Sequence, residues 1–389
     1  VQQQETVASI IKEALATLDV TDINIILDRP KSAEHGDIAC NIAMQLARVL
    51  KQKPRDIADK LVGLIKANPK SQTLFKNIEI AGPGFINFFL ADDARFETIR
   101  KILTDKEAYG FNHDHDGESV LLEFVSANPT GPLHLGHARQ GALGDTLANL
   151  LQTQGWKVTR EFYYNDAGVQ INNLAESIRL RALELLGENI TLPESAYHGE
   201  YIVSIAKEYL AKKPVHTHNG DVIASEGDLN DINSIRRYGV AYLRNEQDDD
   251  LNALGVHFDN FYLESSLYSS GRVQAAVENM IKSGYTYEQD GALWLRTTAC
   301  EKLGIHDDKD RVMKKADGTY TYFVPDVAYH LAKFERGFTK AVNIQGSDHH
   351  GTIARVRCGL QCVSKVLDWN IPKAFPDYIL HKMLSVVKD

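Results

Sequence analysis

The sequence predicts an α/β protein in which a parallel sheet flanked by helices carries a helical insertion and is preceded by a small α+β unit. Two observations support this prediction. From residue 120 onward, apolar strand-like runs alternate with helical runs, the pattern that builds parallel sheets. Residues 1–112 instead combine amphipathic helices with two strands around a glycine-rich turn.

The N-terminal unit, residues 1–112, has apolar patterning of its own, with helical spacing in some runs and strand-like runs elsewhere. In chain order we expect helices over 7–18 and 38–49, strands over 77–81 and 85–90 joined by the turn Gly82-Pro83-Gly84, and a helix over 92–104. A polar linker over 110–117 follows. This unit should therefore fold around its own core.

Residues 113–389 are expected to carry the sheet. The expected strands cover 120–125, 157–163, 261–263, 293–295, 320–323 and 340–344, and helices over 138–148 and 169–186 follow the first two. The rhythm breaks over about 187–259, where a Pro/Gly/Asn-rich stretch separates helical runs. That segment is expected to be the insertion.

Composition is that of an ordinary globular chain, with 43% hydrophobic and 24% charged residues. No apolar stretch approaches the ~20 residues of a membrane span, and the N-terminus shows no secretory signal pattern. Four cysteines in 389 residues favour a reducing compartment over a disulfide framework, so a cytoplasmic protein is expected.

The net charge of −9 does not suggest nucleic-acid binding, but one segment is basic. The segment from Arg48 to Lys76 contains eight basic residues and only two acidic ones, Asp56 and Asp59. Charge alone leaves two interpretations open, a solvated helix face and a nucleic-acid contact.

The most informative motif is His134-Leu135-Gly136-His137, placed where the strand over 120–125 leads into a helix. The free N–H groups and dipole of a helix N-terminus favour phosphate. Gly136 allows close approach to the backbone, and both imidazoles can donate hydrogen bonds to phosphoryl oxygens. Taken alone, the motif is more typical of two surface histidines on a first helical turn.

In its context, the run Ser126–His137 resembles the HIGH motif of class I aminoacyl-tRNA synthetases. Its flanks, with Glu123 in the strand and the later block Tyr163–Ile171, resemble bacterial arginyl-tRNA synthetases. The resemblance spans nearly the whole chain in several blocks. It implies a Rossmann-type catalytic domain that activates L-arginine with ATP and transfers it to tRNA(Arg), as a monomer.

An arginine guanidinium requires planar, acidic partners. Glu123 and Asp326 can supply carboxylates, and Tyr322 a hydroxyl or a stacking face. The resemblance implies that Tyr322 and Asp326 contact the arginine side chain and that Asn128 contacts its α-amino group. Without the family, Asp326 after Pro325 is simply a helix N-cap.

A second strand-to-loop site follows residues 340–344, and doubly wound sheets bind ligands at such strand ends. The ATP contacts implied by the resemblance are Pro132, His134, Gly136, His137, Gly346, Asp348 and His349. His134 and His137 form the catalytic pair that stabilises the α-phosphate transition state, and Mg²⁺ neutralises the leaving pyrophosphate.

Two other functions compete with this one. Asp348-His349-His350 also resembles the metallophosphoesterases, with His113-Asp114-His115-Asp116 as further ligands or Cys358 and Cys362 as a mixed site. The cysteine spacing matches no zinc pattern and is more typical of core packing, so no metal site is predicted. The other alternative is a non-catalytic tRNA-binding module.

The blocks His35–Ala43 and Gly82–Asn87 resemble the additional N-terminal domain of arginyl-tRNA synthetases, which grips the tRNA elbow. Phe85 would stack on a base and Asn87 would bond its edge. A Phe85 that fills the small core is the alternative.

The C-terminal letters Lys382-Met383-Leu384-Ser385 invite comparison with the KMSKS loop of class I enzymes. We instead expect a helix there, ahead of that loop. The chain is accordingly expected to be a fragment that ends before the loop and the anticodon-binding domain, with impaired aminoacylation.

Overall fold

The computed structural model describes residues 2–21, 23–166, 168–218, 220–382 and 384. The chain forms two compact units, Val1–Gly110 and Phe111–Asp389, where the sequence placed the boundary after residue 112. The expected linker residues from 112 on belong to the second unit, since the backbone N–H of Asn112 donates to the carbonyl of Thr153 at 2.9 Å. Among the described residues, no helix has the length and apolarity needed to cross a membrane.

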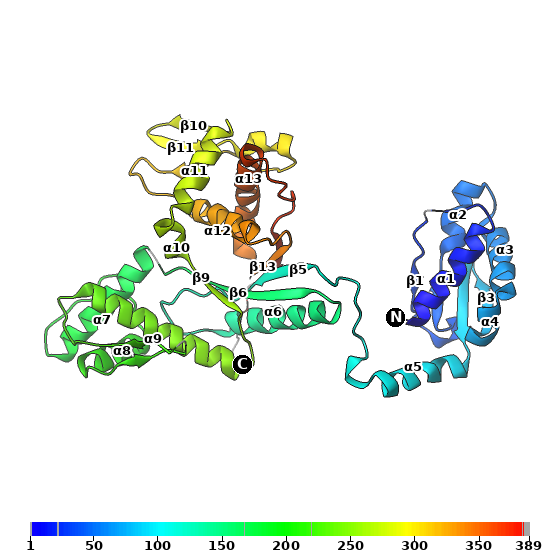
Figure 1. Cartoon of the computed structure of the whole chain (residues 1–389), viewed down its shortest axis with the longest axis horizontal. Coiled ribbons are helices and arrows are strands. Elements are labelled where there is room, and N and C mark those ends of the chain that lie inside the picture. Colours follow the sequence, from blue (N-terminus) through cyan, green and yellow to red (C-terminus); the bar gives the residue numbers. More distant parts are fainter. Residues whose placement is uncertain (1, 22, 167, 219, 383, 385–389) are drawn as a thin grey trace. The chain divides into compact units, whose positions relative to one another are not determined.

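The N-terminal unit is an antiparallel sheet packed against helices (Figure 1). Its strand order is β1-β2-β4-β3, with β1 Leu27–Asp28, β2 Ile38–Cys40, β4 Phe85–Leu90 and β3 Phe75–Ala81. Its helices are α1 (Gln2–Ala16), α2 (Ile42–Leu50), α3 (Pro54–Ala67), α4 (Pro69–Leu74) and α5 (Asp92–Asp105), and α1, α2 and α3 supply most of the helical side of the core.

The expected helix over 38–49 is wrong at its start. Ile38 lies in β2, where it is paired with Phe88 of β4, and α2 begins only at Ile42. Apolar residues four apart satisfy both a helical stripe and the same face of a strand, so the spacing could not separate the two.

The second unit contains a five-stranded sheet whose strands all run parallel, which confirms the predicted α/β class. The order is β14-β13-β5-β6-β9, with β14 Asp377–His381, β13 Ala341–Gly346, β5 Ser119–Glu123, β6 Lys157–Tyr164 and β9 Asn260–Leu263. The chain starts in the middle at β5, moves out to β6 and β9, and returns on the other side to β13. The switch point between β5 and β13 is where such sheets bind ligands.

Helix α6 (Leu135–Thr153) follows β5 and packs along the sheet (Figure 1). Gly144 permits this packing, because a Cβ at this position would lie 2.2 Å from the ring of Phe124. At Gly141, on the same helix, an added Cβ would meet its neighbours at 3.4 Å or more.

We therefore expect Gly144→Ala to lower the free energy of unfolding by roughly 1–3 kcal/mol, the usual cost of overpacking a core. Gly141→Ala should be neutral or slightly stabilising, because alanine is the better helix former. Urea unfolding of the two variants measures both effects. Equal stabilities would show that α6 does not pack on Phe124 as described.

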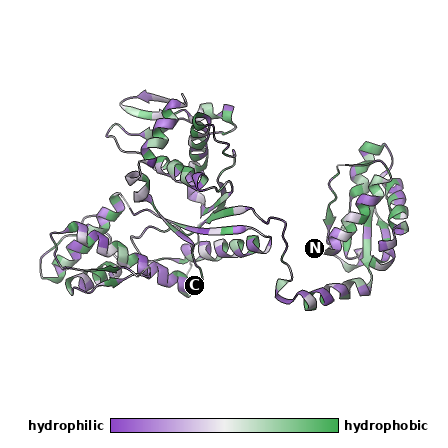
Figure 2. Cartoon of the chain, viewed as in Figure 1, coloured by the Kyte–Doolittle hydropathy of each residue, from purple (hydrophilic) through white to green (hydrophobic). Residues whose placement is uncertain are grey.

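A helical subdomain interrupts the sheet between β6 and β9. It consists of α7 (Val169–Leu185), α8 (Glu200–Leu210), the short strands β7 (Val215–His216) and β8 (Val222–Ile223), and α9 (Ile232–Ala253). Helix α7 belongs to it, because Leu174 and Ile178 share a buried cluster with Tyr238 of α9. The expectation that α7 covers the sheet and that the insertion starts near 187 therefore differs from this packing. In Figure 2 hydrophilic and hydrophobic residues alternate around these helices, as for helices that bury one side.

The strands expected over 293–295 and 320–323 do not join the main sheet. Residues 293–295 fall in β11 (Ala292–Leu295), which pairs antiparallel with β10 (Thr286–Gln289) and β12 (Arg311–Lys314). Tyr322 precedes α12 (Phe323–Glu335), whose Phe323, Val327 and Leu331 are buried at helical spacing. From Phe323 onward the apolar residues therefore follow the helical period and not the strand period.

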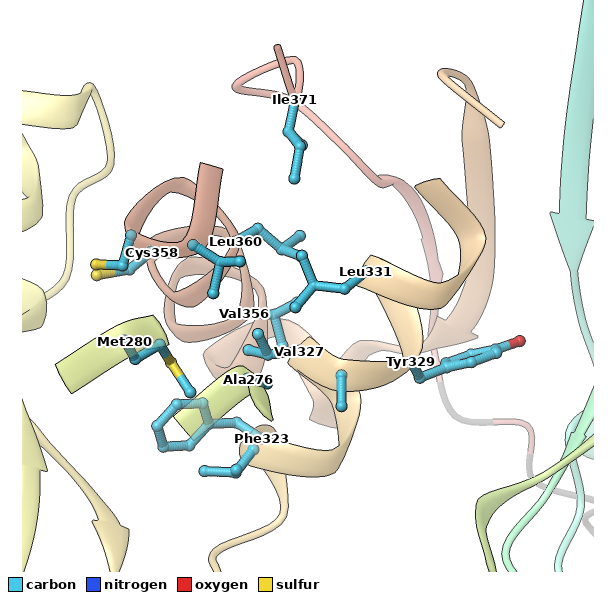
Figure 3. Close-up of a cluster of buried hydrophobic side chains, with 14 of the residues drawn as sticks. Ala276, Met280, Phe323, Val327, Tyr329, Leu331, Val356, Cys358, Leu360 and Ile371 are labelled. Atoms are coloured by element: carbon cyan, nitrogen blue, oxygen red, sulfur yellow. The ribbon is translucent and has the colours of Figure 1, made fainter. Parts of the chain in front are cut away.

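The largest core lies between α11 (Arg272–Lys282), α12 and α13 (His350–Leu367). Figure 3 shows Val327 of α12 gathered with Met280 of α11 and Val356 of α13. Cys358 in this core forms a disulfide with Cys300, which corrects the expectation that the cysteines stay reduced. Cys40 and Cys362 are free and buried.

Candidate active site

The chain leaves β5 through a strained turn at the carboxyl edge of the sheet. Val125 and Ser126 have positive φ angles of 67° and 44°, and a β-branched residue in this region is a genuine outlier. The Ser126 hydroxyl secures the turn, because it donates to Glu123 Oε1 at 3.2 Å and accepts from the backbone N–H of Tyr163 at 3.1 Å. Backbone strain of about 1–3 kcal/mol per residue persists mainly at functional sites.

His134 and His137 cap the start of α6 with their own side chains. His134 Nδ1 accepts a hydrogen bond from the N–H of Gly136 at 3.1 Å, and His137 Nδ1 accepts one from the N–H of His134 at 3.3 Å. The two rings stack, with centroids 3.8 Å apart. A neutral imidazole that accepts at Nδ1 carries its proton at Nε2. Each ring therefore offers one Nε2–H donor.

His137 stays neutral at physiological pH. Burial and the neighbouring His134 lower the pKa of His137 to about 4. Two stacked donors at a helix N-terminus can bind phosphoryl oxygens without requiring a protonation step.

The second candidate loop leaves the neighbouring strand at the same edge. β13 is paired with β5 at Asn343 and Glu123, and it ends at Gly346, followed by the short helix η4 (Ser347–His349). A Cβ on Gly346 would lie 2.3 Å from Asp348 Oδ1, so this carboxylate position depends on the glycine. The side chains of Asp348 and His349 are both exposed, so a ligand can reach them. The two loops therefore flank the switch point of the sheet.

Acidic side chains converge beside the strained turn. Glu123 is buried, and its Oε2 lies 2.5 Å from Nζ of the fully buried Lys333 of α12. Lys333 also donates to Asn343 Oδ1 at 2.9 Å. Asp326 lies in the first turn of α12, and Glu264 lies at the start of α10 (Glu264–Ser269). The carboxylates of Glu123 and Glu264 both raise the pKa of Asp326 electrostatically, so the three groups are close together.

This acidic cluster (Glu123, Glu264 and Asp326) carries more negative charge than its lysine balances. Burial raises the pKa of Asp326 to about 7, and the carboxylates of Glu123 and Glu264 add to this rise. Lys333 supplies one positive charge for three carboxylates. A cationic ligand with planar donors would neutralise the surplus and restore ionised carboxylates.

The two remaining predicted arginine contacts, Asn128 and Tyr322, have other surroundings. Asn128 donates from Nδ2 to Gln170 Oε1 of α7 at 2.7 Å. Tyr322 is 87% exposed. Tyr322, not Asp326, is the N-cap of α12, so the N-cap interpretation of Asp326 is wrong.

A cavity of about 510 Å³ adjoins the histidine motif. It is lined by Asn128, Thr130, Gly131, Pro132, His137, Gln170, Tyr197 and Tyr201. Gln247 of α9 is fully buried and donates to the carbonyls of Asn128 and Gly131 at 3.0 and 2.8 Å, so α9 fixes one wall. The helical subdomain thus completes a pocket that begins at the sheet.

The sequence did not single out Glu264, Lys333 or Gln247. Glu264 had a signal, because it directly follows an expected strand, where a carboxylate points to a site. Lys333 and Gln247 lie on helices whose patterning gives no reason to expect a buried polar side chain.

The predicted pair in the N-terminal unit lies on the outer face of its sheet. Phe85 starts β4 and is 40% exposed, whereas Ile86 and Phe88 enter the core. Asn87 shares the Phe85 face because side chains alternate along a strand, yet it is only 5% exposed. The alternative in which Phe85 fills the core is wrong.

The metal-site alternative finds no ligand cluster at the second loop. In the described part of the chain, the one set of three His, Cys, Asp or Glu ligand atoms within 4.8 Å is Cys300, Cys358 and Cys362, all in the core. His113 and His115 instead bond Asp116 and Glu118 of their own segment, at 3.0 and 2.9 Å.

Comparisons with known proteins agree with this arrangement. The family model for the arginyl tRNA synthetase N terminal domain matches residues 5–90, and that for the catalytic domain of class I (R) tRNA synthetases matches residues 98–360. An arginine–tRNA ligase of Cupriavidus metallidurans is 56% identical over 390 residues, covering 100% of this chain and 63% of the relative. One of Burkholderia ambifaria is 57% identical over 365 residues, covering 94% and 60%.

The solved arginyl-tRNA synthetase of Thermus thermophilus has the same fold, with a TM-score of 0.69 at 20% identity over 97% of this chain and 65% of that one. The chain spans about 63% of the length of the curated relatives it matches.

Proposed function

The chain belongs to the class I (R) tRNA synthetase family, and from this premise we propose that it takes part in ATP-dependent activation of L-arginine and transfer of arginine to tRNA(Arg). The observation that carries the proposal is the unbalanced acidic cluster together with a stacked histidine pair, both near the carboxyl end of β5. The cluster suits a guanidinium, and the histidine pair suits phosphates. Glu123 ends β5 and the histidine pair follows it, so both sites belong to the carboxyl end of this strand, where the reacting groups would meet.

In the proposed reaction, a carboxylate oxygen of arginine attacks the α-phosphorus of ATP and pyrophosphate leaves. Little covalent work falls to the protein, so positioning and charge stabilisation dominate. The Nε2–H groups of His134 and His137 would bind the α-phosphate oxygens as charge develops there. Asn128 would orient the α-amino group and Asp326 the guanidinium, while Gly346, Asp348 and His349 would contact the adenosine.

Mg²⁺ fits this site only as a partner of the ATP phosphates. It prefers oxygen ligands and commonly binds through substrate phosphates plus one or two carboxylates. At this edge the described residues gather no all-protein cage, and Asp348 is assigned to the adenosine. Bound there, Mg²⁺ would neutralise pyrophosphate. A monomeric cytoplasmic protein is also proposed, and the location is supported by the family rather than by the cysteines, because Cys300 and Cys358 form a disulfide.

Arginine binding should strengthen as the pH rises through 7. Because burial raises the pKa of Asp326 from its ordinary 3.8 to about 7, the unliganded protein holds a proton there that a guanidinium must displace. By the same shift, this group's contribution to the free energy of unfolding falls as the pH rises from 3.8 to about 7.

Calorimetric titration should give a Kd for arginine about tenfold weaker at pH 6 than at pH 8. The Asp326→Asn variant should show no such pH dependence. A wild-type Kd that is constant over this range would contradict the assigned role of Asp326.

Phe85→Ala should weaken binding of tRNA(Arg) by about tenfold, because stacking of a base on an aromatic ring contributes roughly 1–3 kcal/mol. Phe96→Ala is a matched control, since Phe96 lies in the same unit on α5 and is 54% exposed. Fluorescence anisotropy with labelled tRNA measures both affinities. Equal losses would show that exposed apolar surface, rather than this position, governs binding.

The overall reaction is tested by incubating the chain with α-labelled ATP, arginine and tRNA(Arg) and following AMP and arginyl-tRNA. We expect AMP formation that requires arginine, with slow transfer to tRNA. Release of phosphate from phosphoesters without arginine would instead support the metallophosphoesterase, and tRNA binding without any AMP would support a non-catalytic module.

A further inference from the structure

Arg139 connects the start of α6 to the end of β14. It lies two residues after His137, and its Nη2 lies 2.7 Å from Nδ1 of His381 and donates to the carbonyl of Lys382. His381 is the last residue of β14 and the register partner of Gly346 in β13. This contact therefore joins α6 to β14, the strand that pairs with β13 next to the Gly346 loop.

The contact between Arg139 and His381 leaves buried polar atoms without partners in the described part of the chain, so it is not arranged mainly for stability. Arg139 Nε and His381 Nε2 are both buried and find no hydrogen-bond partner among the described residues. If His381 Nδ1 accepts from Arg139, its Nε2 carries the proton, so two buried donors remain unpaired. Each such donor costs about 1–3 kcal/mol.

Arg160 of β6, which contacts the same helix, gives the opposite case. Its Nε donates to Asp145 Oδ1 at 3.0 Å, and its Nη2 donates to Asn149 Oδ1 at 2.7 Å, so it links β6 to α6 with both groups satisfied. Arg139 has no carboxylate within ion-pair distance among the residues that the structure describes. Its positive charge is thus left unbalanced close to where the phosphates would bind.

We propose that Arg139 is a positioning residue for the nucleotide, which holds the end of β14 against the histidine-bearing turn and leaves a positive charge for the triphosphate. This inference rests on the proposed function, because it assumes that ATP binds between the loops after β5 and β13. Arg139 acts through the placement of α6, β14 and the Gly346 loop. Both contacts come from Nη2, so the geometric requirement is one planar NH2 group that reaches His381 and Lys382 at once.

The test compares Arg139→Met, Arg139→Lys and Arg160→Met in the full chain. The Kd of a ribose-labelled fluorescent ATP analogue, the Kd of arginine and the Tm are measured for each. Arg139→Met should weaken the ATP analogue by about tenfold and leave the arginine Kd unchanged. Arg139→Lys keeps the charge but replaces the planar guanidinium by an ammonium of different shape, so it should weaken the analogue by about threefold. Arg160→Met should lower the Tm without changing either Kd.

A merely structural role for Arg139 predicts a lower Tm with an unchanged Kd for the analogue, and that result overturns the proposal. Equal weakening by Arg160→Met overturns it too, because any loosening of α6 would then suffice. If Arg139→Met does not fold, Arg139→Lys decides by the same criterion. Failure of the wild-type chain to bind both ATP and arginine would instead overturn the proposed function itself.

Discussion

Replacing His134 with asparagine is expected to slow formation of arginyl-adenylate by about 10²–10³-fold, the usual loss when one preorganised donor to a developing oxyanion is removed. Asparagine is chosen because it is among the best N-cap residues, so its side-chain oxygen can still accept from the N–H of Gly136. The helix start is preserved, while the Nε2–H of the imidazole is lost. Single-turnover kinetics separate the chemical step from binding.

The Kd of arginine should not change in His134→Asn, because the acidic cluster is untouched. His113→Asn is the control, since His113 is exposed and bonds only Asp116 in the segment before β5. An unchanged chemical rate in His134→Asn would remove His134 from the catalytic pair. A parallel loss in His113→Asn would point to a nonspecific effect.

Asp326→Asn is expected to weaken arginine binding by about 10²–10³-fold, because two charge-assisted hydrogen bonds to a guanidinium are lost together. It should also raise the Tm of the unliganded protein above pH 7. The raised pKa of Asp326 means that its charge is unfavourable in the folded state, and the amide removes that charge with the same shape. Calorimetry and thermal unfolding measure these two opposite effects.

Asp145→Asn is the matched control, because Asp145 is paired with Arg160 away from the acidic cluster. It should lower the Tm and leave the arginine Kd unchanged. If Asp326→Asn lowered the Tm while keeping arginine affinity, Asp326 would be a structural residue, and the acidic cluster would not be an arginine site.

The main sheet was predictable because the residues of its strands and of the helix that follows show a local pattern. The run before Ser126 is buried on both faces, and a helix start follows it, which together indicate a parallel strand. The expected strand over 320–323 is reduced to a β-bridge at Tyr320, because burial of Phe323 and Val327 against α13 starts a helix at Phe323, although aromatic and β-branched residues favour strands. That contact partner lies far along the chain, and local patterning cannot supply it.

The candidate site shows the same limit. Glu123 and Asp326 were found because they lie in motifs, and the structure brings both to one acidic cluster. Lys333 was not found, since its partner Glu123 lies 210 residues away and an apolar helix gives no sign of a buried amine. Tyr322 was assigned through resemblance, and in the unliganded chain it is exposed to solvent.

The central claim is that one site at the end of β5 holds both arginine and ATP. Arginine-dependent exchange of labelled pyrophosphate into ATP, measured with and without tRNA(Arg), tests it most directly. The account predicts exchange with arginine that is lost with citrulline, whose neutral urea group cannot neutralise the acidic cluster. Exchange that proceeds equally well with citrulline, or with no amino acid, would contradict it.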